Sequence, residues 1–180
     1  MMTDKLKRQA PPLQKNQTPR FFLAQIACFM LVFLSSTALA APTSFIAEVV
    51  AVLAGDTLKV LKSRQVMVVR LQGIDAPEKT QRYGQQAKDF TEGVAFGEKV
   101  VVNVKGIDRD ENIVAEVVME DGRSLNREVV KAGFAWWHRE HSEDLSLWRL
   151  EDKAREAKLG LWLGEDPVPP WEFRESMGGR

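Results

Sequence analysis

The chain has 180 residues, which is enough for one domain with a substantial hydrophobic core but not comfortably for two. It contains 25 basic and 25 acidic residues, but the first 40 positions hold five basic residues and one acidic residue. Residues 41–180 therefore carry 20 basic against 24 acidic residues. Nucleic-acid-binding domains usually have a basic surplus, so this balance counts against tight non-specific DNA binding through overall charge.

The first 40 residues have the pattern of a secretory signal peptide. A basic segment ends at Arg20, an apolar run follows over residues 21–34, and small residues lead to Ala38-Leu39-Ala40. This order is typical of an export signal that is cleaved after Ala40. An uncleaved membrane anchor is the alternative, although the apolar run is shorter than the roughly 20 residues that a spanning helix needs.

Cleavage after Ala40 also removes Cys28, the one cysteine of the chain. The remaining protein then has neither a disulfide nor a thiolate metal site. We expect an exported protein, periplasmic or extracellular, with no stable membrane association after cleavage and a monomer as the default state. Its single domain covers residues 41–180, with a core at about residues 44–174.

Short apolar segments rich in Val and Ile predict five strands, at residues 45–53, 57–61, 66–74, 99–104 and 113–119. The third strand is expected to stop at Pro77, because proline cannot donate to a strand ladder. Helical periodicity predicts helices at residues 85–96, 124–131 and 144–158, followed by an extended tail at residues 167–171. The predicted fold class is α+β: a five-stranded OB-type β-barrel with about three packed helices.

Oxygen ligands are the main candidates for chemistry. Asp56 follows the first predicted strand, and Asp75 and Glu78 follow the third. Carboxylates at strand ends can converge on one end of a barrel and bind a hard cation such as calcium. Arg70 could hold a phosphate through its planar set of N–H donors. Metal, carboxylate and guanidinium together suit phosphodiester hydrolysis, although an Asp at a strand end is also common turn chemistry.

The two histidines of the chain, His138 and His141, are spaced so that both could face one side of a helix. Two histidines without a third ligand make a poor zinc site, so we interpret them as surface residues. Among the five tryptophans, Trp148 and Trp162 are expected to pack helices against the barrel.

The segment Val69-Arg70-Leu71-Gln72-Gly73-Ile74-Asp75-Ala76-Pro77-Glu78 closely resembles the central motif of the staphylococcal nuclease-like (thermonuclease) family. Gly55-Asp56-Thr57 stands where that family has Asp-Gly-Asp-Thr. The resemblance continues through Gly84, the Asp108-Arg109 turn, Asn126 and Gly160-Leu161-Trp162, and ends at Pro169-Pro170-Trp171-Glu172-Phe173-Arg174, which is similar to the tails of secreted bacterial members. It covers essentially all of residues 44–174.

The resemblance implies a calcium-dependent phosphodiesterase that acts on DNA and RNA. It implies that Asp56, Asp75 and the backbone carbonyl of Ala76 are calcium ligands. By the same resemblance, Glu78 orients or deprotonates the attacking water, and Arg70 is one of two arginines that grip the scissile phosphate. Trp136 and His138 fall where aromatic side chains of the family stack near the bound nucleotide.

Two positions depart from the family pattern. Ala54 replaces the first acid of Asp-Gly-Asp-Thr, which predicts weakened calcium binding. Asn112 replaces the second phosphate-binding arginine, and removal of one such group typically costs about 10²–10³ in rate or more. Arg109 could substitute only by folding back over roughly 10 Å of chain.

The sequence therefore leaves more than one function open. The first is a nuclease with reduced activity, which uses Asp56, Asp75, Glu78 and Arg70. The alternatives are a catalytically inactive homologue that binds single-stranded nucleic acid on its barrel, and an exported protein-interaction module. The joint presence of the four site residues favours the nuclease, whereas Asn112 and the acidic balance favour the alternatives.

Overall fold

The computed structural model describes residues 44–178. The predicted signal segment, residues 1–40, lies outside this part of the chain. Within residues 44–178, no helix is both long enough and apolar enough to cross a membrane.

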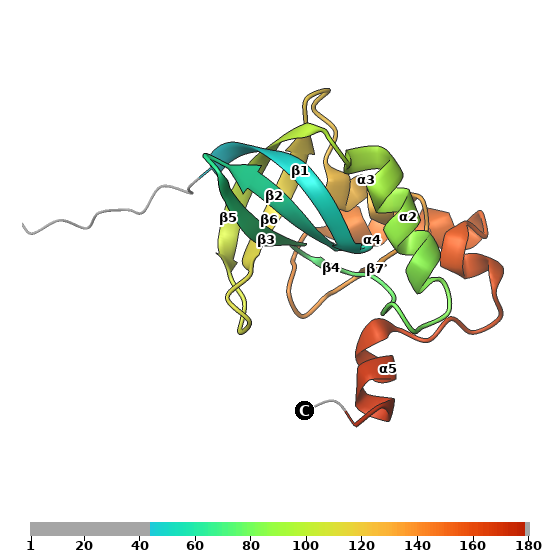
Figure 1. The fold of residues 1–180 in the computed structure, drawn as a ribbon. Helices are drawn as coiled ribbons and strands as arrows, with labels where there is room; N and C mark the ends of the chain where they lie inside the picture. Colours follow the sequence, from blue (N-terminus) through green and yellow to red (C-terminus); the bar gives the residue numbers. More distant parts are fainter. Residues whose placement is uncertain (1–43, 179–180) are drawn as a thin grey trace, which may run out of the picture. The chain divides into compact units, whose positions relative to one another are not determined.

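Five strands close into a barrel in the order β1-β2-β3-β6-β5 (Figure 1). They are β1 (Ser44–Ala54), β2 (Thr57–Lys62), β3 (Gln65–Leu71), β5 (Lys99–Ile107) and β6 (Ile113–Met119). All neighbours are antiparallel except β3 and β6, which run parallel. The predicted α+β fold with a five-stranded barrel is confirmed.

The barrel interior is filled by every second residue of each strand, as expected when one face of a strand is buried. Val49, Leu58, Val60, Val69, Val102 and Val117 are fully buried. Their burial stabilises the barrel, since each such side chain contributes about 1.5–3 kcal/mol. This core holds the strand ends, and with them the site, in fixed positions.

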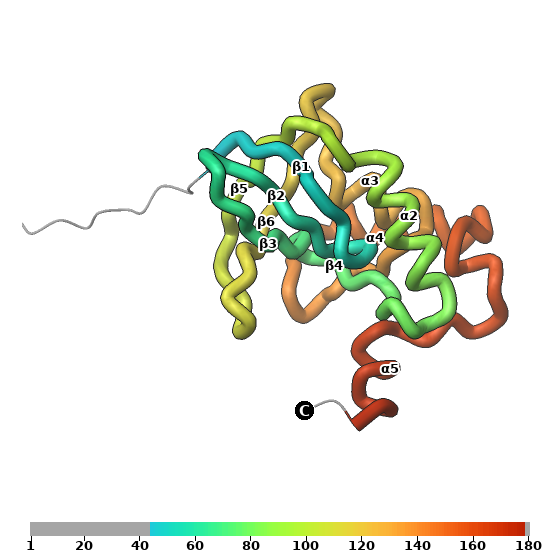
Figure 2. Tube along the Cα trace, in the orientation of Figure 1, coloured from blue at the N-terminus to red at the C-terminus, as the bar shows by residue number. Residues whose placement is uncertain are grey.

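Four helices and one 3-10 turn complete the domain: α2 (Gly84–Ala95), α3 (Leu125–Lys131), α4 (Leu145–Glu156), η1 (Gly160–Leu163) and α5 (Pro170–Ser176). Helix α2 lies against β1 (Figure 2), where a Cβ on Gly55 would come within 2.8 Å of the Ala87 Cβ. The Thr91 hydroxyl of α2 also donates to the Gly55 carbonyl at 2.7 Å. This close contact fixes the β1–β2 turn.

The third strand ends earlier than predicted. Strand β3 stops at Leu71, and Gly73 turns the chain with a positive φ of 79°. Asn126 stabilises this break, because its side-chain amide donates to the carbonyls of Gln72 and Ala115 and its oxygen accepts from the Val117 N–H. After the turn, β4 (Ile74–Asp75) pairs with β7 (Trp136–Trp137) in a separate two-stranded sheet.

The tail is helical beyond Pro169, so the predicted extended conformation is wrong for its last part. Pro170 occupies the first turn of α5, a position that tolerates proline because its missing N–H would have no partner there. Trp148 also differs from expectation, since it is 48% exposed on α4. Trp162 is buried and packs edge-on against Trp136, with ring centroids 5.2 Å apart.

Candidate active site

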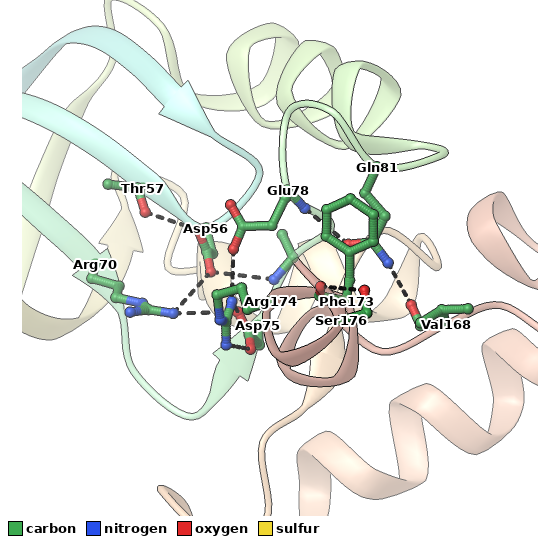
Figure 3. Close-up of polar contacts among 11 residues, drawn as sticks. Asp56, Thr57, Arg70, Asp75, Glu78, Gln81, Val168, Phe173, Arg174 and Ser176 are labelled. Atoms are coloured by element: carbon green, nitrogen blue, oxygen red, sulfur yellow. Dashed lines mark hydrogen bonds and ion pairs between the residues drawn. The ribbon is translucent and has the colours of Figure 1, made fainter. Parts of the chain in front are cut away.

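The four residues predicted to carry the chemistry lie together at one end of the barrel (Figure 3). Asp56 lies in the β1–β2 turn, Arg70 near the end of β3, Asp75 in β4, and Glu78 in the loop that follows β4. The Arg70 guanidinium joins the two aspartates, because its Nη2 lies 3.3 Å from Asp75 Oδ1 and 3.9 Å from Asp56 Oδ2.

Asp56 is held by both its backbone and its side chain. Its carbonyl accepts the Leu71 N–H at 2.8 Å, which ties the turn to the end of β3. Its carboxylate accepts the Thr57 hydroxyl at 2.8 Å and the Ala76 N–H at 3.2 Å. Because three neighbours fix it, Asp56 presents its carboxylate to the site in one orientation.

Asp75 is the most buried charged residue of the site, with 1% exposure against 4% for Asp56. The pairing of β4 with β7 places Asp75 opposite Trp136 and fixes its backbone. Its carboxylate receives two arginines, Arg70 and Arg174. A buried carboxylate needs such partners, because an unpaired buried charge is strongly destabilising.

Burial raises the pKa of Asp56 above its ordinary value of 3.8. The positive charge of Arg70 opposes this shift, whereas the neighbouring carboxylate of Asp75 adds to it. The two carboxylates therefore repel each other in a poorly solvated place. Additional positive charge between Asp56 and Asp75 would stabilise the ionised form of both carboxylates.

The loop of Glu78 is fixed by short-range contacts. The Glu78 N–H donates to the Gln81 side chain at 3.1 Å, and its carbonyl accepts the Gln81 N–H at 2.9 Å. Gly84, the first residue of α2, packs on the same carbonyl so closely that a Cβ would overlap the oxygen. The Glu78 side chain remains 41% exposed, so it can reach a substrate.

The residues present suit a hard divalent cation. Two buried carboxylates, Asp56 and Asp75, and the carbonyl of Ala76 supply oxygen atoms of the type that calcium prefers. Within residues 44–178, no group of three His, Cys, Asp or Glu side chains is placed to hold a metal ion, and the Asp75 carboxylate is bonded to Arg70 and Arg174. Calcium takes about six to eight oxygen ligands, so water or substrate would supply the others.

Comparison with known proteins identifies the fold family. Residues 68–164 match the sequence model of the family described as "Staphylococcal nuclease homologue". The chain belongs to this family. A protein described as an uncharacterized endonuclease from Escherichia coli is 42% identical over 127 residues, which cover 71% of this chain and 83% of the relative. A protein described as micrococcal nuclease from Shigella flexneri is 34% identical over 142 residues, covering 73% and 82%.

A third relative, Protein ParB of Escherichia coli, is 36% identical over 143 residues and covers 74% of this chain and 81% of its own length. The match to the staphylococcal nuclease family model includes Arg70, Asp75 and Glu78, but it begins after Asp56 and ends before α5. The site thus combines residues from inside and outside the matched segment.

Ala54 and Asn112, the two positions predicted to depart from the family pattern, have local structural roles. Ala54 ends β1 and pairs with Thr57 across the turn. The Asn112 side chain donates to Asp108 Oδ2 at 3.0 Å, and its N–H donates to Asp108 Oδ1 at 2.9 Å. Asn112 is therefore engaged within its own turn, while Arg109 is exposed there. Neither makes any of the ion pairs found at the site among the described residues.

Of the predicted stacking residues, Trp136 lies on β7 opposite Asp75, and His138 directly follows β7. Trp136 is only 3% exposed and packs against Trp162 and Trp171. His138 contacts Trp171, with ring centroids 5.2 Å apart, and His141 at 4.2 Å. Burial lowers the pKa of His138, and His141 adds to that shift. Their role in nucleotide binding stays a prediction.

Arg174 is the site residue that the sequence did not identify. It lies on α5, and its Nη1 is 2.7 Å from Glu78 Oε1 while its Nη2 is 2.7 Å from Asp75 Oδ2. Hydrogen bonds to Asp75 raise the pKa of Arg174 above its already high value. The available signal was indirect: Arg174 closes the tail segment that resembles the tails of secreted members, and the same resemblance predicts an arginine where this chain has Asn112.

Proposed function

We propose that the protein is an exported, calcium-dependent phosphodiesterase that hydrolyses DNA and RNA. One observation carries the proposal: Asp56, Arg70, Asp75 and Glu78 come from four different chain segments and meet at one end of the barrel. The endonuclease and micrococcal nuclease names of its relatives support a nucleic-acid substrate. The signal-like N-terminus supports export.

The proposed roles follow from the chemistry of each side chain. Asp56, Asp75 and the Ala76 carbonyl would hold the cation, which would supply positive charge to polarise a phosphoryl oxygen. Glu78 accepts a proton from the water whose oxygen forms the new bond to phosphorus. Arg70 donates hydrogen bonds to the non-bridging oxygens while the bond to the leaving sugar oxygen breaks.

The charges of the site fit an anionic substrate once a cation is present. Three carboxylates and two guanidinium groups give a net charge of −1 when all are ionised. A divalent cation would change this to +1, which favours a phosphodiester. We therefore expect substrate binding and hydrolysis to depend on calcium, with Ala54 limiting the calcium affinity.

The competing function is an inactive homologue that binds nucleic acid or a protein. The engagement of Asn112 within its own turn favours this alternative, as does the acidic excess of residues 41–180. With no other guanidinium in place of residue 112, the nuclease would have reduced activity.

The test is hydrolysis of single-stranded DNA by the purified protein, with calcium and with a chelator, beside a Glu78→Gln variant. We expect calcium-dependent cleavage that falls by about 10²–10⁴ in Glu78→Gln, because the proton acceptor is lost. Circular dichroism should show an unchanged fold. Absence of cleavage by the parent protein at any calcium concentration would exclude the nuclease and favour the binding module.

A further inference from the structure

Helix α5 brings a second guanidinium to the site from the end of the chain. We propose that Arg174 is a catalytic residue that supplies the second phosphate-binding arginine, in place of residue 112. This inference rests on the proposed phosphodiesterase function. It changes the expectation for activity, because the chain then has two guanidinium groups at the site.

Arg174 and Arg70 both contact Asp75, and Arg174 does so through two hydrogen bonds and also bonds Glu78. Arg70 Nη2 lies 3.3 Å from Asp75 Oδ1, and Arg174 Nη1 lies 3.2 Å from the same oxygen. Their side chains are 37% and 38% exposed. Figure 3 shows the two guanidinium groups reaching the cluster from different elements, with Glu78 above Arg174. A phosphate placed between them could accept hydrogen bonds from both.

Residue 112 would reach the same region from the barrel. Val114 pairs with Arg70 across β3 and β6, and Asn112 lies two residues before it, at the end of the β5–β6 turn and roughly 7 Å away along an extended chain. An arginine side chain could thus reach the site either from the β5–β6 turn or from α5. In this chain the turn has Asn112, and α5 has Arg174.

Helix α5 is docked in a way that orients Arg174. Pro170 is buried, and Trp171 packs edge-on against Trp136, with ring centroids 6.5 Å apart. Residues 171 and 174 are three apart and therefore share one face of the helix. Gln81 adds a link, because its side chain donates to the Val168 carbonyl at 2.5 Å and accepts the Glu78 N–H. The tail and the Glu78 loop are thus held together.

The ion pairs of Arg174 with Asp75 and Glu78 could also hold α5 over the site and block substrate binding. A role in catalysis and a role in blocking the site predict different effects of substitution. The Arg174 side chain is 38% exposed, so a substrate can reach its guanidinium although its partner Asp75 is buried. A phosphate is a strong competing acceptor for the planar guanidinium. Arg70 contacts the same buried carboxylate and has the same exposure, which favours a shared role over a blocking role.

The decisive experiment compares single-turnover cleavage of single-stranded DNA in calcium by the parent protein, Arg174→Ala, Arg174→Lys and the double variant Asn112→Arg/Arg174→Ala. We expect Arg174→Ala to lose about 10²–10³ in rate. Lysine should recover only part of it, because it lacks the planar pair of donors. The double variant should cleave at least about tenfold faster than Arg174→Ala. Arg149→Ala, an exposed arginine of α4, is the matched control and should cleave normally.

An unchanged rate in Arg174→Ala would overturn the proposal, and a faster rate would show that α5 blocks the site. Thermal unfolding of each variant checks that the barrel is intact. Asp75 keeps Arg70 as a partner when Arg174 is lost, so the transition should fall less than it does in Arg70→Ala.

A binding measurement separates this proposal from the proposed function. In calcium, the double variant Glu78→Gln/Arg174→Ala should bind oligothymidylate at least about tenfold more weakly than Glu78→Gln alone. The slope of log affinity against log salt should also drop by about 0.7, as expected for one lost phosphate contact. Equal affinities and slopes would overturn the role of Arg174. If the parent protein does not cleave but the affinities differ, only the phosphodiesterase function fails.

Discussion

Arg70 and Arg174 contact the same carboxylate, but the structure holds them in very different ways. Arg70 belongs to β3, which is hydrogen-bonded on both sides, to β2 and to β6. Arg174 belongs to a seven-residue helix near the end of the chain, and that helix is docked mainly through Pro170 and Trp171. The first arginine is thus part of the barrel, whereas the second is attached to it.

Because the two arginines are held differently, substitutions near them should differ in how strongly they affect the stability of the fold and the rate of cleavage. A strand residue is positioned by the same hydrogen bonds and core contacts that fold the barrel, so its placement is as stable as the domain. A terminal helix can detach locally while the barrel remains folded. Changes near Arg174 should therefore alter activity more than they alter the unfolding of the barrel.

The largest effect is expected from Arg70→Ala. An arginine on a transferring phosphoryl group contributes about 10³–10⁵ in rate, and the buried Asp56 would also lose its cationic partner, whereas Asp75 keeps Arg174. Single-turnover cleavage and thermal unfolding measured side by side should both fall. A variant that loses activity but keeps its full thermal stability would contradict the view that Arg70 is integral to the barrel.

Gly84→Ala should have the next largest effect. A Cβ at this position overlaps the Glu78 carbonyl oxygen, so the loop has to move. A displacement of about 1 Å at a catalytic group can cost roughly 10²-fold in rate. Gly93→Ala on the same helix is the matched control, because a Cβ there meets no atom within 4 Å. Similar rates in the two variants would show that the Glu78 loop tolerates this shift.

The barrel and the carboxylate cluster could be predicted because their signals are local. Alternating Val and Ile residues mark the strands, and Asp56, Asp75 and Glu78 follow strand ends. The break after Leu71 was missed because it depends on Asn126, more than 50 residues away. Arg174 was missed for the same reason. Its partners, Asp75 and Glu78, lie 99 and 96 residues earlier in the chain, and only the docking of α5 brings them together.

A smaller effect is expected from Trp171→Ala. The substitution removes the edge-on contacts with Trp136 and His138, each worth about 0.5–1.5 kcal/mol beyond the buried area. If Arg174 depends on this docking, cleavage should fall by up to about tenfold while the main unfolding transition stays in place. Hydrogen exchange should increase in residues 170–176 only. Faster exchange throughout the barrel would instead show that α5 is part of the cooperative core.

The smallest effect, and the one confined to stability, is expected at the start of α4. Asp144 caps this helix by accepting the Ser146 N–H at 2.9 Å, and it also pairs with Arg127. The hydrogen bond to Ser146, followed by Arg127, lowers the pKa of Asp144 below 3.8. Asp144→Ala should cost about 1 kcal/mol at neutral pH and leave cleavage unchanged.

Asp144→Asn keeps a capping side chain and removes only the charge, so it isolates the pH dependence. Because the folded pKa is the lower one, the stabilisation by the charge is fully present above pH 3.8 and is lost as the pH falls through the folded value. The difference in unfolding free energy between the parent protein and Asp144→Asn should therefore close in acid. A difference that persists at pH 2 would mean that the contribution of Asp144 does not depend on its charge.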